Sequence, residues 1–270
     1  MRHTPRKRFG QNFLVDEHVI DRIIAAIDPR PGEYVVEIGP GQGALTRPLL
    51  ASGAHFKVVE IDRDLAEALP RQVIGLERSN IHVGDALKTD FTTLYPGAEG
   101  QGLRVVGNLP YNISTPLLAK LLDQVEIIRD MHFMLQREVV KRMAASPGNK
   151  DYGRLAIMCQ YHCQVVPLFS VPADAFSPVP KVESGFVRLI PHQEKPVKVP
   201  DHALFGRVVA KAFSQRRKTL RNSLRKVLTE EQIAEAGINP GLRPENLSLD
   251  DYARLTEVVA HYGTIKTTGR

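Results

Sequence analysis

A glycine-rich run, Glu37-Ile-Gly-Pro-Gly-Gln-Gly43, has the composition of a loop that binds a nucleotide. It follows the short apolar stretch Tyr34-Val-Val-Glu-Ile38 and precedes a segment with helical signals, so we expect it between a strand and a helix. Glycines let the backbone turn sharply and approach a ligand closely. The spacing is G-x-G-x-G, not the G-x-G-x-x-G of dinucleotide-binding proteins. A plain tight turn would explain this loop equally well if nothing else accompanied it.

Two acidic residues end the next two predicted strands and strengthen the nucleotide hypothesis. Glu60 stands 21 residues beyond Gly39, where an acid that accepts hydrogen bonds from a ribose belongs. Asp85 follows Gly84 at the end of the third strand, where a carboxylate could accept from the amino group of an adenine. A glycine loop and two strand-end acids predict a site for an adenosine-containing ligand. Their order favours a methyl donor over a nicotinamide cofactor.

A third motif, Asn108-Leu-Pro-Tyr111, follows the predicted strand Arg104–Gly107 beside that site. A strand-to-helix turn capped by asparagine is the plain alternative. The chemical interpretation is more specific. An aromatic amine is a poor nucleophile because its lone pair is delocalised into the ring. Two acceptors that each bond one of its hydrogens would favour a pyramidal nitrogen and direct the lone pair at the methyl group. The Asn108 amide oxygen and the Pro110 carbonyl can be those acceptors, with Tyr111 stacked on the base. Catalysis would then depend on positioning and desolvation, and we expect no metal.

The elements that must position these residues follow the pattern of an α/β protein. Strand and helix signals alternate through the first two-thirds of the chain, which predicts a mostly parallel sheet with helices on both faces. A Pro-rich linker, residues 191–200, divides this domain from a helical remainder. We therefore predict one domain over residues 1–193 and a small all-helical one over 194–270. The predicted strands are 34–38, 56–62, 81–85, 104–107 and 131–135, with a closing pair at 164–171 and 182–190, after a first helix at 16–27.

Basic residues are concentrated in two stretches. The net charge is +6, but residues 1–8 and 205–226 together carry +12 and no acid, so the rest of the chain carries −6. Such segregation indicates a polyanion as partner, although a solvated basic surface is the alternative. At helical spacing, five of the cations fall opposite an apolar face, and Arg216, which falls on the apolar side, indicates a break near Ser214-Gln215. The predicted RNA contacts are Arg207, Lys211, Lys218, Arg221 and Arg225, with Arg6, Lys7 and Arg8.

The motifs together closely resemble a known family, the small-subunit ribosomal RNA adenine dimethyltransferases. The resemblance rests on Phe9-Gly-Gln-Asn-Phe-Leu14, the glycine loop, Asn108–Tyr111 and Phe176-Ser-Pro-Val-Pro-Lys181, and it runs in order through Phe213–Leu220. It implies a Rossmann-like class I methyltransferase sheet and S-adenosylmethionine as the donor. It implies that Phe176 stacks opposite Tyr111 on the target base. The donor pocket would be lined by Asn12, Leu14, Gly39, Glu60, Asp85 and Asn108.

The resemblance also implies a substrate, with two alternatives. It implies dimethylation of two adjacent adenosines near the 3′ end of small-subunit ribosomal RNA, late in subunit assembly. A resistance-type adenine methylase of large-subunit RNA shares Gln11-Asn12-Phe13 and the Asn-Pro-aromatic site, but Gly39–Gly43 and Arg216–Lys218 favour the small-subunit enzyme. A non-catalytic nucleic-acid-binding factor with the same fold is the third hypothesis. The intact Glu60, Asp85, Asn108 and Tyr111 argue against it.

The composition is that of a cytoplasmic globular protein. The chain has 270 residues, 43% hydrophobic and 24% charged, with no apolar run long enough for a membrane span. Only Cys159 and Cys163 occur, which predicts a reducing compartment. With His162 they fall short of a zinc-binding set, so we expect both thiols to be buried on a helix and His132 to be a core residue. Nothing indicates an obligate dimer, and we expect a monomer.

Overall fold

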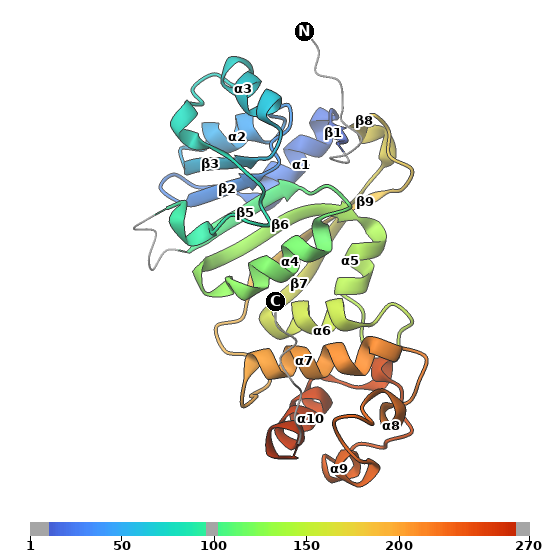
Figure 1. The fold of residues 1–270 in the computed structure, drawn as a ribbon. Helices are drawn as coiled ribbons and strands as arrows, with labels where there is room; N and C mark the ends of the chain where they lie inside the picture. The colour runs from blue at the N-terminus through green and yellow to red at the C-terminus, as the bar shows by residue number, and fades with distance from the viewer. Residues whose placement is uncertain (1–10, 96–101, 263–270) are drawn as a thin grey trace. The chain divides into compact units, whose positions relative to one another are not determined.

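The computed structural model describes residues 11–95 and 102–262 (Figure 1). The chain forms two compact units. Among the described residues, the first unit comprises those up to Val140 together with Gln164–Pro191, and the second comprises Lys141–Cys163 together with those from His192 onward. None of the helices in the described ranges is long and apolar enough to cross a membrane.

A seven-stranded sheet forms the first unit, with the strand order β4-β3-β2-β5-β6-β9-β7. The five strands from β2 to β6 run parallel, and β9 is antiparallel to β6. The predicted mostly parallel sheet is confirmed, including the closing strand pair. The strands are β2 (Tyr34–Ile38), β3 (His55–Glu60), β4 (Ile81–Val83), β5 (Leu103–Asn108), β6 (Ile128–Gln136), β7 (Cys163–Val171) and β9 (Ser184–Pro191).

Helices cover both faces of this sheet, as predicted. Neighbouring strand residues point to opposite faces, and both Val35 and Val36 are 0% exposed. One face packs against residues of α1, α2 and α3, while Figure 1 shows α4 in front of the sheet. The helices are α1 (Glu17–Ile27), α2 (Thr46–Ala51), α3 (Arg63–Gln72), α4 (Ser114–Asp123) and α5 (Arg137–Met143).

The strand order places the predicted site residues at one edge. The chain leaves β2 for β3 on one side and later returns to β5 on the other, so these neighbours diverge at the carboxyl end of β2. Open α/β sheets bind ligands at such a point. Ile38 pairs with Val59 and Glu37 with Val106, so the residues that follow β2, β3 and β5 emerge side by side.

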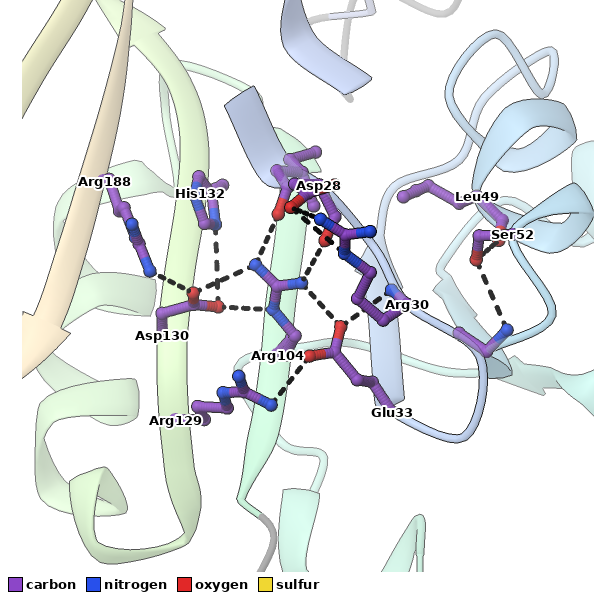
Figure 2. A network of polar contacts seen from close by, with 12 residues as sticks. Asp28, Arg30, Glu33, Leu49, Ser52, Arg104, Arg129, Asp130, His132 and Arg188 are labelled. Atoms are coloured by element: carbon purple, nitrogen blue, oxygen red, sulfur yellow. Dashed lines mark hydrogen bonds and ion pairs between the residues drawn. The ribbon is translucent and has the colours of Figure 1, made fainter. Parts of the chain in front are cut away.

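A buried ion network ties the opposite end of the sheet to α1 (Figure 2). Arg104 on β5 is 4% exposed and makes five hydrogen bonds. Two go to Asp130 on β6, at 2.9 and 3.0 Å, and one to Glu33 at 2.7 Å. The other two go to the carbonyls of Ile27 and Asp28, where α1 ends and its last carbonyls lack helical partners. The guanidinium thereby fixes one helix end to two strands.

His132, beside this network, should make stability depend on pH. The side chain is 0% exposed, and burial lowers its pKa to about 4. The unfolded chain binds a proton at this histidine near pH 6.5 and the folded chain does not. The stability that comes from keeping this histidine neutral should therefore be fully present above pH 6.5. As the pH falls from 6.5 to 4, the free energy of unfolding should decrease by about 3 kcal/mol.

Urea unfolding of His132→Leu and the wild type at several pH values tests this. We expect the variant to lose less stability than the wild type on acidification. The pKa of His162 in the second unit is also lowered to about 4, so the difference between variants isolates His132. The exposed His18→Leu is the matched control and should keep the pH slope of the wild type. Equal slopes for His132→Leu and the wild type would contradict the assignment.

The second unit is helical. It includes an earlier segment of the chain as well as the residues after the predicted boundary at 193. Residues 141–163 belong to it because Ile157 and Tyr161 of α6 are buried in one core with Phe205 and Leu255. Cys159 is buried there and burial raises the pKa of its thiol, while Cys163 is also buried, with its pKa raised to about 12. The helices are α6 (Arg154–His162), α7 (His202–Ala212), α8 (Leu220–Ser223), α9 (Glu230–Glu235) and α10 (Leu249–Tyr262).

The break predicted near Ser214-Gln215 is confirmed, so the cations of residues 205–225 do not share one continuous helical face. Helix α7 ends at Ala212, a 3-10 turn covers Phe213–Gln215, and α8 begins only at Leu220. Arg216 explains the break. Its guanidinium donates to the carbonyls of Lys150 and Tyr152 and pairs with Glu245, so it leaves the apolar side that a straight helix would give it.

Candidate active site

A cavity of about 320 Å³ opens at the carboxyl ends of β2, β3 and β5. It lies wholly within the first unit. All six residues predicted to hold the donor line it, and so do Pro110 and Tyr111. The six are Asn12, Leu14, Gly39, Glu60, Asp85 and Asn108.

The glycine loop forms the floor of this cavity and needs its glycines. Gly39 and Gly41 have φ values of 68° and 57°, which favour glycine. A Cβ on Gly41 would also lie 2.9 Å from Cδ1 of Phe13. The N-terminal segment therefore packs directly on the loop, an approach that only a residue without a side chain permits.

Glu60 is held rigidly at the end of β3. It is 4% exposed, and its Oε1 accepts from the backbone N–H of Asp62 at 2.8 Å. Its Oε2 accepts a longer bond, 3.4 Å, from the N–H of Gly41. Burial raises the pKa of the carboxyl. These bonds join the acid to the glycine loop and leave further lone pairs on both oxygens for ligand hydroxyls.

Asp85 lies beyond the end of β4, in a half-buried turn. Its Oδ1 accepts from the N–H of Leu87 at 2.9 Å, which fixes the carboxyl group in the turn. Its backbone carbonyl accepts from the hydroxyl of Thr89 at 3.0 Å. An oriented carboxylate at this edge can accept a hydrogen bond from an amino group in the cavity.

Glu37, which we did not predict as a site residue, also lines the cavity. It is 2% exposed, and Thr46 Oγ1 donates to its Oε2 at 2.7 Å. Burial, reinforced by repulsion from Glu60, raises the pKa of Glu37 to about 8. The carboxyl is therefore mostly protonated at neutral pH. One signal of its place at the cavity was present in the sequence, since Glu37 opens the glycine motif.

Asn108 at the end of β5 has a fixed amide orientation. Its Nδ2 donates to the backbone carbonyl of Asn12 at 2.9 Å. A carbonyl oxygen can only accept, so it is the NH₂ of the amide that faces Asn12 and not the oxygen. Asn108 lines the cavity, and no donor to its Oδ1 is found in the described part of the chain. This is the acceptor orientation that the sequence hypothesis requires.

The turn after Asn108 is held at several points. The Ile113 N–H donates to the Pro110 carbonyl at 3.2 Å, which uses one of two lone pairs on that oxygen. The Ser114 hydroxyl donates to the carbonyl of Tyr111 at 3.2 Å. The Tyr111 hydroxyl lies 2.9 Å from Ser184 Oγ, a residue that nothing in the sequence had singled out. Among the described residues, one lone pair of the Pro110 carbonyl has no protein donor.

Phe176 is placed differently from the other predicted residues. It lies on the short strand β8 (Phe176–Ser177), which pairs with β1 (Phe13–Leu14). Its side chain is 2% exposed, packs in the core with Leu14 and does not line the cavity. The structure therefore does not bring it together with Tyr111. Stacking on a base would require the ring to leave this core.

The predicted RNA contacts of the second unit are not equivalent. Lys218, Arg221 and Arg225 are exposed beyond the break in the helix, although Arg221 lies 3.3 Å from Glu230. Arg207 and Lys211 are half-buried on α7. The other three predicted contacts, Arg6, Lys7 and Arg8, lie outside the described residues.

Comparisons with known proteins match nearly the whole chain to one family. Residues 2–261 match the family model for ribosomal RNA adenine dimethylase. A ribosomal RNA small subunit methyltransferase A of Pseudomonas fluorescens is 56% identical over 258 residues, covering 96% of this chain and 95% of that protein. The protein of the same name from Yersinia pestis is 53% identical over 262 residues, covering 97% and 96%.

Two solved structures have the same fold over nearly the whole chain. A dimethyladenosine transferase from Plasmodium falciparum has a TM-score of 0.75 and 26% identity, covering 90% of this chain and 95% of that one. The 23S rRNA methyltransferase ErmE has a TM-score of 0.66 and 28% identity, covering 92% and 100%. The resemblance seen in the motifs is confirmed: this chain belongs to the ribosomal RNA adenine dimethylase family.

Proposed function

We propose that this enzyme transfers methyl groups from S-adenosylmethionine to the exocyclic amino nitrogens of two adjacent adenosines near the 3′ end of small-subunit ribosomal RNA. It acts on the small subunit late in assembly, as a monomer in the cytoplasm. The names of the relatives that match nearly the full chain support the small subunit as substrate. The observation that carries the chemistry is the fixed orientation of the Asn108 amide.

The residues of the cavity fit the donor. S-adenosylmethionine supplies an activated methyl group on a sulfonium when it is bound. The volume of about 320 Å³ is in the range of small-molecule sites. Glu60 offers buried acceptors for ribose hydroxyls, and Asp85 offers one for the adenine amino group. Asn12 and Leu14 lie on the N-terminal segment that packs over the glycine loop.

The target amine would meet acceptors in two directions. Asn108 Oδ1 and the second lone pair of the Pro110 carbonyl can each accept one of its hydrogens. Both groups are held by the backbone before substrate arrives, so little reorganisation is needed during the reaction. The Tyr111 ring supplies a stacking surface in the cavity wall, and base–aromatic stacking contributes about 1–3 kcal/mol.

Glu60→Ala tests the donor site. We expect it to weaken S-adenosylmethionine binding roughly ten- to a few hundred-fold, because one or two charge-assisted hydrogen bonds are lost. Isothermal titration calorimetry measures this directly. Glu67→Ala, which removes an exposed carboxylate from the neighbouring helix α3, should bind the donor like the wild type. Tight binding of NADH with no affinity for S-adenosylmethionine would overturn the assignment of the cavity.

The exposed cations beyond α7 should produce a salt-dependent affinity for RNA. If about five cations of the chain contact phosphates, log affinity should fall against log salt with a slope of about −3.5 to −4.5. Reversing Lys218, Arg221 and Arg225 to Glu should flatten that slope by roughly 2 to 3 and weaken RNA binding. Donor affinity should not change.

A matched control separates this effect from the change in net charge. Reversing Arg71, Arg78 and Lys88, three exposed cations of the first unit, alters net charge by the same amount. Fluorescence anisotropy with a labelled RNA at several salt concentrations compares the two triple variants. Equal slopes for both would mean that residues 218–225 make no specific phosphate contacts.

Nucleoside mass spectrometry tests the substrate. Undermethylated small subunits and bare large-subunit RNA are treated side by side with enzyme and S-adenosylmethionine and then digested to nucleosides. We expect dimethyladenosine from the small subunits. Dimethyladenosine in the large-subunit RNA alone would favour the resistance-type methylase. None from either RNA, with assembly intermediates included, would favour a non-catalytic binding factor.

A further inference from the structure

One fully buried hydroxyl in the first unit has no part in the chemistry described above. Ser184 begins β9, pairs with Gln136 at the end of β6 and is 0% exposed. Its Oγ lies 2.9 Å from the hydroxyl of Tyr111. Within the described residues, this is its one side-chain hydrogen bond. A buried polar group left without a partner costs about 1–3 kcal/mol, so the two hydroxyls are strongly coupled.

We infer that Ser184 is a positioning residue for methyl transfer, which holds the ring of Tyr111 in the orientation that stacks on the target base. The inference rests on the proposed function. Ser184 does not line the cavity, so it would act only through Tyr111.

The Tyr111 ring is held at both of its ends by this arrangement. The backbone at Tyr111 is fixed by the Ser114 hydroxyl, which donates to its carbonyl at 3.2 Å. The χ1 torsion of an aromatic side chain can adopt several staggered rotamers, so a fixed backbone alone still lets the whole ring swing. A change of χ1 would carry the hydroxyl away from Ser184, so the hydrogen bond between Ser184 and the far end of the ring restricts that torsion. A preoriented ring does not have to be ordered again when the base arrives.

The strand that carries Ser184 cannot easily shift. Residues 184–189 of β9 pair one for one with β6. The next residue, Gly185, packs so closely on α5 that an added Cβ would lie 3.1 Å from Cγ2 of Val140. The Arg137 N–H also donates to the Glu183 carbonyl at 3.0 Å. The hydroxyl is therefore presented from a rigid strand rather than from a loop, as a positioning group requires.

A double-mutant cycle tests the inference. Ser184→Ala, Tyr111→Phe and the double variant are compared with the wild type in single-turnover methyl transfer at saturating RNA and S-adenosylmethionine. Each single variant should lower the rate about 3- to 10-fold, the equivalent of one hydrogen bond. The double variant should be no slower than either single variant, because both break the same bond. Donor affinity should stay within about twofold of the wild type.

The controls distinguish positioning from stability. Ser52→Ala removes another hydroxyl of the first unit, which donates to the Leu49 carbonyl away from the cavity, and should keep the wild-type rate. If Ser184→Ala folds poorly, Tyr111→Phe breaks the same bond without altering β9 and must still show the loss. The inference would be overturned if both single variants kept the wild-type rate, or if their losses multiplied in the double variant. Either result would leave the proposed function intact. A wild type that binds donor but methylates no RNA would overturn the proposed function and this inference with it.

Discussion

Asn108→Ala is expected to lower the rate of methyl transfer about 100- to 1,000-fold, the loss seen when one preorganised polar contact to a reacting group is removed. The side chain lines the cavity with its amide oxygen available and its NH₂ bound to the Asn12 carbonyl at 2.9 Å. Alanine removes the acceptor for the target amine. It also removes the bond to Asn12, so donor affinity should fall by less than about tenfold. Single-turnover transfer and calorimetry separate the two effects.

Asn80→Ala is the matched control for this variant. Asn80 also donates its Nδ2 to a backbone carbonyl at 2.9 Å, that of Phe56, but it does not line the cavity. The Asn80→Ala variant should lose some stability, but its folded form should transfer methyl groups at the wild-type rate. A rate for Asn108→Ala equal to that of Asn80→Ala would mean that the amide oxygen has no role in transfer.

Arg104→Met is expected to destabilise the first unit by about 3–5 kcal/mol, because it leaves buried charges without their partner. Asp130, 1% exposed, would keep the half-exposed Arg188 at 2.9 Å and the buried His132 at 3.6 Å. The carbonyls of Ile27 and Asp28 would also lose their donor (Figure 2). Urea unfolding at pH 7 measures the change. Donor affinity of the folded variant should match the wild type, since Arg104 does not line the cavity.

Two further variants show whether the stability lost in Arg104→Met depends on the burial of the charges. Arg30→Met breaks the pair between Arg30 and Asp28, whose side chains are 66% and 61% exposed, and should cost less than about 1 kcal/mol. Replacing Arg104 and Asp130 together by Leu should recover much of the stability, because the buried carboxylate of Asp130 is removed with its partner, Glu33 keeps Arg129, and Arg188 is half-exposed. Similar losses for Arg104→Met and Arg30→Met would contradict the role given to the network.

Local patterns predicted the strands, and they predicted that the strand-end residues lie together. Tyr34–Ile38 is apolar except for Glu37 and lies between a helix and a glycine cluster, and β2 has those bounds. Because parallel strands end at one edge, Glu60, Asp85 and Asn108 could be placed around one cavity from their positions at strand ends alone. Their chemistry followed from residue type, since each offers acceptor oxygens.

Contacts between distant segments could not be read from those patterns. Ser184 and Tyr111 are 73 residues apart, and only the placement of β9 beside β6 brings their hydroxyls together. Arg216 fits the helical period poorly, and its partners Lys150, Tyr152 and Glu245 decide where α7 ends. Phe176 was assigned from a family motif, but the pairing of β8 with β1 buries its ring. In each case tertiary packing, not local propensity, determined the outcome.

The number and position of methyl groups transferred test the central claim most directly. Undermethylated small subunits are incubated to completion with S-adenosylmethionine labelled on its methyl group, and the RNA is then cut into fragments for mass spectrometry. We predict two methyl groups on each of two neighbouring adenosines, all in the fragment from the 3′ end. Subunits that are treated with the Asn108→Ala enzyme and sampled at the same times should carry almost no methyl groups. The account would be contradicted by label on other nucleotides or on adenosines outside the 3′ fragment. It would also be contradicted if each adenosine carried one methyl group when the reaction is complete.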